Sequence, residues 1–112
     1  MDIKAYLERI DYGGPVEPTA ETLVRLHRAH MLAVPFENLD IHLDRPVKLG
    51  DASLYSKIVE SRRGGFCYEM NGLFAALLRA LGFRVDMLSA GVTREDGSFG
   101  PPFDHMALLV HL

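Results

Sequence analysis

The sequence lacks the features that mark several large classes of protein. A single cysteine in 112 residues allows no internal disulfide, so a reducing compartment such as the cytoplasm fits best. No uninterrupted apolar run approaches the ~20 residues of a membrane-spanning helix, and residues 1–4 lack the charged-then-apolar layout of a secretory signal. A net charge of −3 leaves no basic excess for binding phosphates. We therefore expect a cytoplasmic protein that binds neither a membrane nor a nucleic acid.

Common ligand-binding patterns are missing as well. The sequence contains neither a G-x-G-x-x-G run nor a glycine-rich loop that ends in G-K followed by Ser or Thr. His27 and His30 are three residues apart, but no third ligand is spaced to join them, and one cysteine gives no thiolate cluster. We therefore expect no bound metal. The remaining composition, 48% apolar and 24% charged, is that of one globular unit.

Helical spacing dominates the first 82 residues. Apolar residues from Ile3 to Ile10 predict a first helix capped by Asp2, and a second helix follows Pro18 with Thr19 as its cap. The expected inner face of this second helix consists of Leu23, Leu26, His27, His30, Met31 and Val34. Residues 36–50 predict a loop with short extended pieces.

Two more helices are predicted after this loop. Asp51 is the expected cap of a third helix, which carries Leu54, Tyr55, Ile58 and Val59 and is broken by residues 62–65. The clearest helical pattern runs from Met70 to Leu81, with apolar residues at i, i+3, i+4, i+7, i+8 and i+11. Gly82 stands where a left-handed glycine ends a helix.

A strand period replaces the helical one after Gly82. Phe83, Val85 and Met87 alternate with residues of the opposite face, which predicts a strand. Residues 95–98 predict a turn, and residues 100–102 an irregular connection. The segment 105–110 is apolar on both faces, which predicts a buried second strand. Since a two-stranded sheet is marginal by itself, we expect further strands in a longer parent protein.

Cys67 is the first candidate for chemistry, because it stands where a glycine-containing turn meets the clearest helix. Free N–H groups and the helix dipole at a helix N-terminus favour an anion, here the thiolate. Arg62 and Arg63 add positive charge nearby, while Gly64 and Gly65 allow a tight turn and leave open space at the approach to the sulfur. The alternative is that Cys67 is an inert core residue that begins a helix.

A thiol nucleophile needs a base, and histidine is the usual partner. His105 opens the second predicted strand beside Asp104, and a strand edge is a rigid place from which to direct an imidazole. The other histidines lie on a predicted helix face, in a loop or near the last residue: His27, His30, His42 and His111. Cys67 and His105 are therefore the candidate catalytic pair, in the chain order of cysteine acyl-transfer enzymes, although triad order varies between folds.

Three segments resemble one known family. Residues 63–71, Arg-Gly-Gly-Phe-Cys-Tyr-Glu-Met-Asn, resemble the R-G-G-x-C-x-E-x-N signature of the arylamine N-acetyltransferases. Residues 34–42 are similar to the P-F-E-N-L segment of that family, and residues 103–110 place a histidine at a strand start as the family does. Shorter similarities lie at 6–10 and 81–83, so the resemblance covers nearly the whole chain.

The resemblance implies an α+β fold with an active site like that of cysteine peptidases. Residues 1–82 would form an N-terminal helical bundle carrying Cys67, and residues 83–112 the first strands of an incomplete β-barrel-like domain carrying His105. The triad aspartate of the family lies beyond the last residue of this chain, and Asp104 would point to the opposite strand face. The resemblance thus implies a truncated acetyltransferase whose active site is incomplete in the 112 residues.

The resemblance also implies a ping-pong reaction. Cys67 would attack the thioester of acetyl-CoA, release CoA and pass the acetyl group from an acetyl-cysteine to the nitrogen of an arylamine or hydrazine. His105 would take the thiol proton, and Phe36 would line the acceptor pocket. The side chains implied to support the nucleophile are Arg63, Glu69 and Asn71. Acetyl-CoA is the implied donor, and no metal takes part.

Two alternatives remain open at this point. A cysteine peptidase or transglutaminase-like enzyme would keep the same Cys–His pair and use water or a protein amine as acceptor, although that chemistry does not require the segment 34–42. A non-catalytic helical module would use Cys67 as a core residue and its open strand edge as an interaction surface. The same edge leaves association of two chains into a homo-oligomer open.

Overall fold

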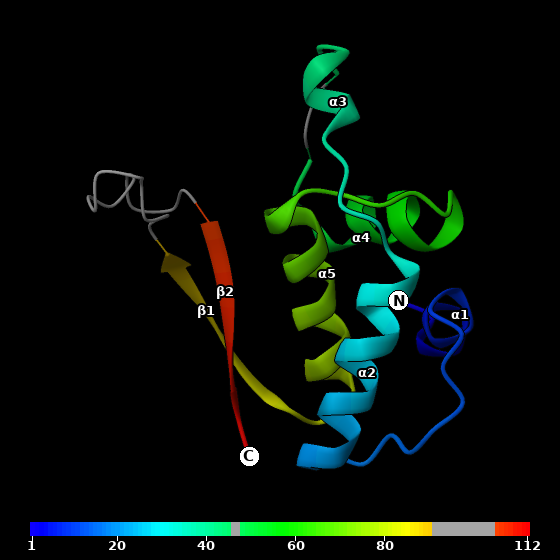
Figure 1. The fold of residues 1–112 in the computed structure, drawn as a ribbon, viewed down its shortest axis with the longest axis vertical. Helices are drawn as coiled ribbons and strands as arrows, with labels where there is room; N and C mark the ends of the chain where they lie inside the picture. Colours follow the sequence, from blue (N-terminus) through cyan, green and yellow to red (C-terminus); the bar gives the residue numbers. More distant parts are fainter. Residues whose placement is uncertain (46–47, 91–104) are drawn as a thin grey trace.

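The computed structural model describes residues 1–45, 48–90 and 105–112 of the chain. The fold is α+β, with helices followed by an antiparallel pair of strands (Figure 1). The elements are α1 (Ile3–Arg9), α2 (Ala20–Ala33), α3 (Leu39–His42), α4 (Asp51–Tyr55), the π-helical turn η1 (Ser56–Glu60), α5 (Cys67–Ala80), β1 (Arg84–Ala90) and β2 (His105–His111). No helix among the described residues has the length and apolar character to cross a membrane. The turn and connection expected at 95–98 and 100–102 lie outside the described residues.

Local capping signals are confirmed at three helix ends. The carboxylate of Asp2 accepts a hydrogen bond from the backbone N–H of Ala5 (3.1 Å), and Thr19 accepts one from the N–H of Thr22 (3.2 Å). These bonds satisfy N–H groups that have no partner inside the helix. Gly82 follows α5 with φ +99°, the left-handed conformation expected there.

The segment between α2 and the Cys67 turn differs from the prediction in two respects. Residues 39–42 form the short helix α3 inside the expected loop, and its Asp40 is held by ion pairs to Lys57 and Arg63. The expected cap Asp51 instead lies in the first turn of α4, and Gly50 is the N-cap. An acidic residue in the first turn still favours the helix through its dipole. Tertiary contacts thus define this region more than local propensity does.

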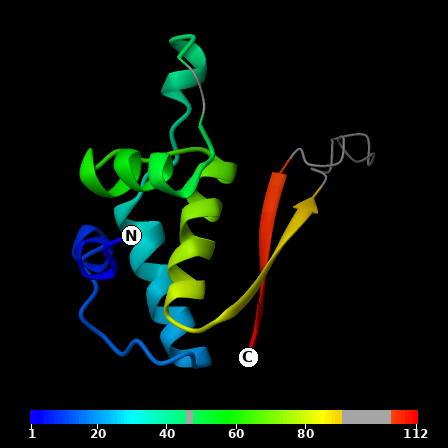
Figure 2. The ribbon, with the colours of Figure 1, turned by 180° about the vertical axis from the view of Figure 1, so that it is seen from behind.

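The core lies between α5 and the helices around it. Helix α2 runs beside α5 in the opposite direction, α1 covers one side of this pair, and the hairpin lies beyond α5 on the other side (Figures 1 and 2). The buried apolar side chains are Tyr6, Ile10, Leu26, Val34, Leu54, Ile58, Val59, Leu73, Phe74, Ala75, Leu77, Leu78, Phe83, Val85 and Met106.

The inner face of α2 is narrower than its apolar pattern predicts. Thr22, Leu26 and His30 are buried at intervals of four residues, whereas His27 is exposed and the Met31 side chain is 66% exposed. The expected burial of His27 and Met31 is therefore wrong in this structure. Both residues instead line an open cavity beside α5.

The two strands are only partly covered. Their register pairs Arg84 with His111 and Ala90 with His105. Phe83, Val85 and Met106 are buried, but Met87 and Leu109 are each 45% exposed. The prediction of a strand buried on both faces is therefore wrong for β2, because α5 is the main element that packs on this sheet among the described residues.

His30 is a neutral core residue whose position gives a pH-dependent stability. Its Nε2 lies 2.8 Å from the Tyr6 hydroxyl, and its ring packs 4.8 Å from the Phe74 ring. Burial, followed by the nearby His27 and Arg9, lowers the pKa of His30 from 6.5 to about 4. Because the unfolded chain binds a proton at pH values where the folded chain does not, stability is complete above pH 6.5 and falls as the pH drops toward 4.

We expect the free energy of unfolding to drop by about 2 kcal/mol between pH 7 and pH 5 through His30 alone. Urea unfolding at a series of pH values measures this change. His30→Gln should be less stable at pH 7 and should lose this part of the slope, whereas His42→Gln, which changes an exposed histidine, should keep it. Equal slopes in the native chain and His30→Gln would contradict the assignment.

Candidate active site

Cys67 is the first residue of α5 and is half-buried. The preceding residue, Phe66, has extended backbone angles, and its N–H donates to Oε1 of Glu69 (3.2 Å). Glu69 is three residues into α5, where a carboxylate commonly bonds back to the helix start and complements the helix dipole. The helix N-terminus that carries the thiol is therefore fixed by the buried carboxylate of Glu69, which is 3% exposed.

The two glycines before Cys67 permit close packing. A Cβ at Gly64 would lie 1.8 Å from the carbonyl oxygen of Pro35, and a Cβ at Gly65 would lie 2.8 Å from the Cβ of Glu69. The expected open space at these glycines is therefore filled by neighbouring atoms. The left-handed residue of the turn is Arg62 (φ 55°), while neither glycine has a positive φ.

A strand-like contact joins this turn to the segment after α2. Gly65 N–H donates to the Pro35 carbonyl (3.2 Å), and Glu37 N–H donates to the Gly65 carbonyl (3.0 Å), which forms a parallel bridge between Phe36 and Gly65. The bridge places Phe36 opposite Gly65, which is two residues before Cys67 in the sequence. The Phe36 side chain is 64% exposed. It shares a cavity of about 300 Å³ with His27, His30, Met31, Val34, Pro35, Met70, Asn71 and Phe74.

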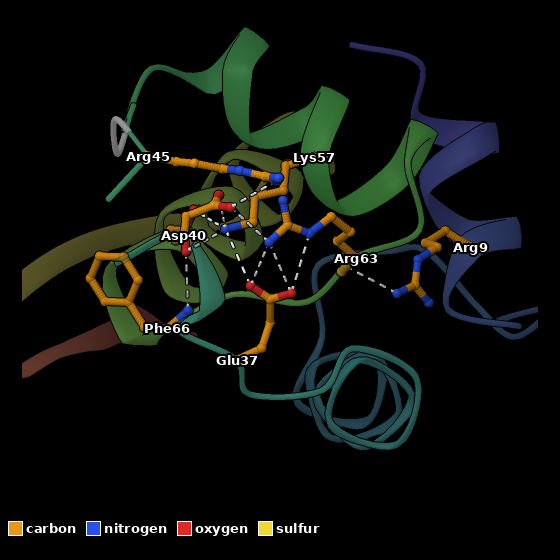
Figure 3. Close-up of polar contacts among 8 residues, drawn as sticks. Arg9, Glu37, Asp40, Arg45, Lys57, Arg63 and Phe66 are labelled. Atoms are coloured by element: carbon orange, nitrogen blue, oxygen red, sulfur yellow. Dashed lines mark hydrogen bonds and ion pairs between the residues drawn. The ribbon is translucent and has the colours of Figure 1, made fainter. Parts of the chain in front are cut away.

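Behind the turn lies a charge cluster that consists of Glu37, Asp40, Lys57, Arg63 and Glu69 (Figure 3). The Nζ of Lys57 lies 2.8 Å from Glu69, 3.0 Å from Asp40 and 3.5 Å from Glu37. Arg63 donates to Glu37 (3.0 Å) and Asp40 (2.9 Å). The guanidinium of Arg63 is thus hydrogen-bonded to two carboxylates of the segment after α2. The sequence did not predict these partners for Arg63.

Mutual pairing sets the protonation states in the charge cluster. Hydrogen bonds from Lys57 and then Arg63 lower the pKa of Asp40. Desolvation acts against the charged form of Lys57, but hydrogen bonds to Glu69 and Asp40 outweigh it and raise the pKa of Lys57. The bond to Asp40 is the main cause that raises the pKa of Arg63. These shifts keep the cations and Asp40 ionised over the physiological pH range.

A buried arginine from α1 supports the same turn from the other side. Arg9 donates to the backbone carbonyls of Ile58 (2.7 Å), Ala33 (2.9 Å), Arg63 (3.2 Å) and Arg62 (3.4 Å). Sequence analysis missed the roles of both Arg9 and Lys57. The available signal was a charged residue beside core positions, Tyr6 and Ile10 for Arg9 and Ile58 and Val59 for Lys57.

Asn71 connects α5 to the strand that begins with the candidate base. Its Nδ2 donates to the carbonyl oxygen of Met106 (2.6 Å), one residue after His105. Asn71 is four residues after Cys67, so both lie on the same face of α5. The His105 backbone begins β2, while its side chain and Asp104 lie outside the described residues. Among the described residues, no group of His, Cys, Asp and Glu is arranged to hold a metal.

Comparison with known proteins gives one consistent result. A family model described as N-acetyltransferase matches residues 19–112. The pineal gland isozyme of arylamine N-acetyltransferase from Gallus gallus is 45% identical over 114 residues, covering 100% of this chain and 39% of that protein. Among solved structures, arylamine N-acetyltransferase from Nocardia farcinica is 48% identical with a TM-score of 0.92, covering 99% of this chain and 39% of that one.

A second solved structure shows a ligand. Arylamine N-acetyltransferase from Mycobacterium marinum, solved in complex with CoA, is 40% identical with a TM-score of 0.90 and covers 98% of this chain and 41% of that one. The fold and these similarities show that the chain belongs to the arylamine N-acetyltransferase family, of which it matches the N-terminal portion. The chain spans about two fifths of the length of the curated relatives it matches.

Proposed function

We propose that the full-length parent of this chain transfers an acetyl group from acetyl-CoA to the nitrogen of an arylamine or hydrazine through an acetyl-cysteine at Cys67. Family membership supports the reaction class, and the CoA complex of the Mycobacterium marinum relative supports the donor. The division into a helical domain over 1–82 and the start of a β domain over 83–112 belongs to the same proposal.

The hydrogen bond from Asn71 to the Met106 carbonyl carries the proposal most directly. It brings the beginning of β2, and with it the His105 backbone, against the face of α5 that carries Cys67. Cys67 and His105 are 38 residues apart in the sequence, so they can share one site only if β2 lies against α5. A base must come within hydrogen-bonding distance of its nucleophile, and this contact provides a structural basis for such an approach.

In the proposed reaction, His105 takes the proton of the Cys67 thiol, and the sulfur attacks the thioester carbonyl. The carbon–sulfur bond to CoA breaks, the CoA thiolate leaves, and the acetyl group remains on Cys67. His105 gives its proton to the leaving CoA thiolate. An amine nitrogen then attacks the acetyl carbonyl carbon and loses its proton to His105, the carbon–sulfur bond to Cys67 breaks, and the amide leaves with the Cys67 thiolate regenerated. Phe36 would hold the aromatic ring of the acceptor beside the cavity between α2 and α5, while Arg63, Glu69 and Asn71 would position the turn, the helix start and the strand.

The first half-reaction gives a direct test. Mixing the full-length parent with acetyl-CoA in the absence of an acceptor should add one acetyl group to the intact mass, and peptide mapping should place it on Cys67. Adding an aniline should then release the acetyl group as the anilide. Cys67→Ser should form no labile thioester, and His105→Gln should form the adduct at least 100-fold more slowly, the usual scale for loss of a general base.

The control variant is His42→Gln, which changes an exposed histidine outside the cavity that Phe36 lines. In a second control, the unreactive analogue desulfo-CoA replaces acetyl-CoA. A folded full-length parent that acquires no acetyl group, or one acetylated equally well after Cys67→Ser, would contradict the proposal. Cleavage of a peptide without acetyl transfer would support the cysteine peptidase alternative instead.

A further inference from the structure

Four separate segments meet at one ammonium group. Lys57 comes from η1, Glu69 from α5, Asp40 from α3 and Glu37 from the segment after α2, and all three carboxylates lie within 3.5 Å of the Lys57 Nζ (Figure 3). The Lys57 side chain is only 12% exposed, and the side chain of Glu69 is 3% exposed. Surface ion pairs contribute little because water and salt screen them, but this group is largely shielded from both.

The charge balance of the cluster depends on Lys57. Glu37, Asp40 and Glu69 carry three negative charges, and Lys57 and Arg63 carry two positive charges, which leaves one net negative charge. Two further cations lie near this cluster among the described residues. Arg45 is 3.9 Å from Asp40 and 62% exposed, and Lys48 lines a cavity together with Lys57 and Glu69. Without Lys57, Glu69 would lose its cation in a buried position, which is strongly unfavourable.

Glu69 transmits the position of Lys57 to the nucleophile. Its Oε1 accepts hydrogen bonds from both the Lys57 Nζ (3.0 Å) and the Phe66 N–H (3.2 Å), and Phe66 immediately precedes Cys67. The same lysine holds Glu37, whose N–H bonds Gly65, and thus the strand-like contact that carries Phe36. One side chain therefore links the start of α5 to the segment expected to hold the acceptor.

We infer that Lys57 is a positioning residue that holds the buried carboxylate of Glu69 and, through it, fixes the N-terminus of α5 at which Cys67 stands. The inference deepens the proposed function and rests on it for its catalytic meaning. Lys57 acts by holding a buried carboxylate in the one place from which it accepts the Phe66 N–H.

The test is the rate of Cys67 alkylation by iodoacetamide, followed by intact mass, as a function of pH. Lys57→Gln should slow alkylation at pH 7 by about five- to tenfold, because Glu69 then loses its cation and no longer holds the Phe66 N–H in one place. Lys57→Arg should restore most of the rate, since it keeps the charge. Lys4→Gln, which removes the same charge from an exposed site on α1, should leave the rate unchanged.

The double variant Lys57→Gln with Glu69→Gln decides between positioning and general stabilisation. It returns the cluster to one net negative charge, and a glutamine at 69 still offers an oxygen to the Phe66 N–H. We expect its alkylation rate to recover to within about threefold of the native chain. Far-UV circular dichroism reports folding, so the double variant provides the decisive result if Lys57→Gln alone does not fold.

A folded Lys57→Gln with native alkylation at every pH, or a folded double variant that stays slow, would overturn the inference. The acetyl adduct is measured separately in the full-length parent and its Lys57→Gln variant. Slow alkylation of Lys57→Gln together with no acetyl transfer in the native parent would support the inference about Lys57 and contradict the proposed function. Normal acetyl transfer in both the native parent and Lys57→Gln would support the proposed function and contradict the inference about Lys57.

Discussion

Gly64→Ala should lower the free energy of unfolding by about 3 kcal/mol or more, because its methyl group cannot be placed without moving backbone. The added Cβ would lie 1.8 Å from the carbonyl oxygen of Pro35 and 2.8 Å from its carbonyl carbon. Relief of this overlap requires the turn before Cys67 to separate from the segment after α2. The bonds from Gly65 to Pro35 and from Glu37 to Gly65 would then lengthen or break.

Urea unfolding measures this loss, and the rate of Cys67 alkylation measures its effect on the site. The matched control is Gly13→Ala, where an added Cβ has no neighbour within 4 Å and stability should change little. If Gly64→Ala and Gly13→Ala unfold at the same urea concentration, the close approach of Gly64 to Pro35 is not as described.

Arg9→Met should be the second large loss, about 3–5 kcal/mol of the free energy of unfolding. Methionine retains most of the apolar stem but donates no hydrogen bond, so the carbonyls of Ile58 and Ala33 lose their Arg9 donors in a buried place. The carbonyls of Arg62 and Arg63 lose a donor as well. Since small domains have only about 5–15 kcal/mol of stability, a partly unfolded population is expected at 37 °C.

Thermal and urea unfolding of Arg9→Met, with Arg9→Lys as the intermediate case, measure the effect. Arg25→Met is the control, since Arg25 forms a single ion pair with Glu21 in which both side chains are more than half exposed. Hydrogen exchange should also accelerate at residues 62–66 in Arg9→Met. A native-like unfolding midpoint for this variant would show that the four carbonyl bonds contribute nothing measurable.

The residue pattern alone predicted those features that depend on neighbours within one or two helical turns. Asp2 and Thr19 act as caps, Gly82 ends α5, and Cys67 begins that helix, because each is decided by backbone groups a few positions away. The short motifs around Cys67 and Phe36 were also sufficient to indicate the arylamine N-acetyltransferase family, which the comparisons confirmed.

Exposure was predicted less well than element type. Met31 was expected on the inner face of α2, yet it is 66% exposed. A periodic pattern shows which residues share a face, but it does not show how far another element covers that face. The short helix α3 was missed for a related reason, since its Asp40 is held by side chains from later in the chain.

The sequence by itself determined the local conformations and the identity of the candidate nucleophile. Only the tertiary structure showed Lys57 beside Glu69, Asn71 on the Met106 carbonyl and Arg9 on the turn before Cys67. These contacts join residues 12, 35 and 54 positions apart, respectively. No local preference encodes such separations, because they depend on how the whole set of helices packs. The surroundings of Cys67 are thus a property of the assembled fold, whereas its place at a helix start is a property of the sequence.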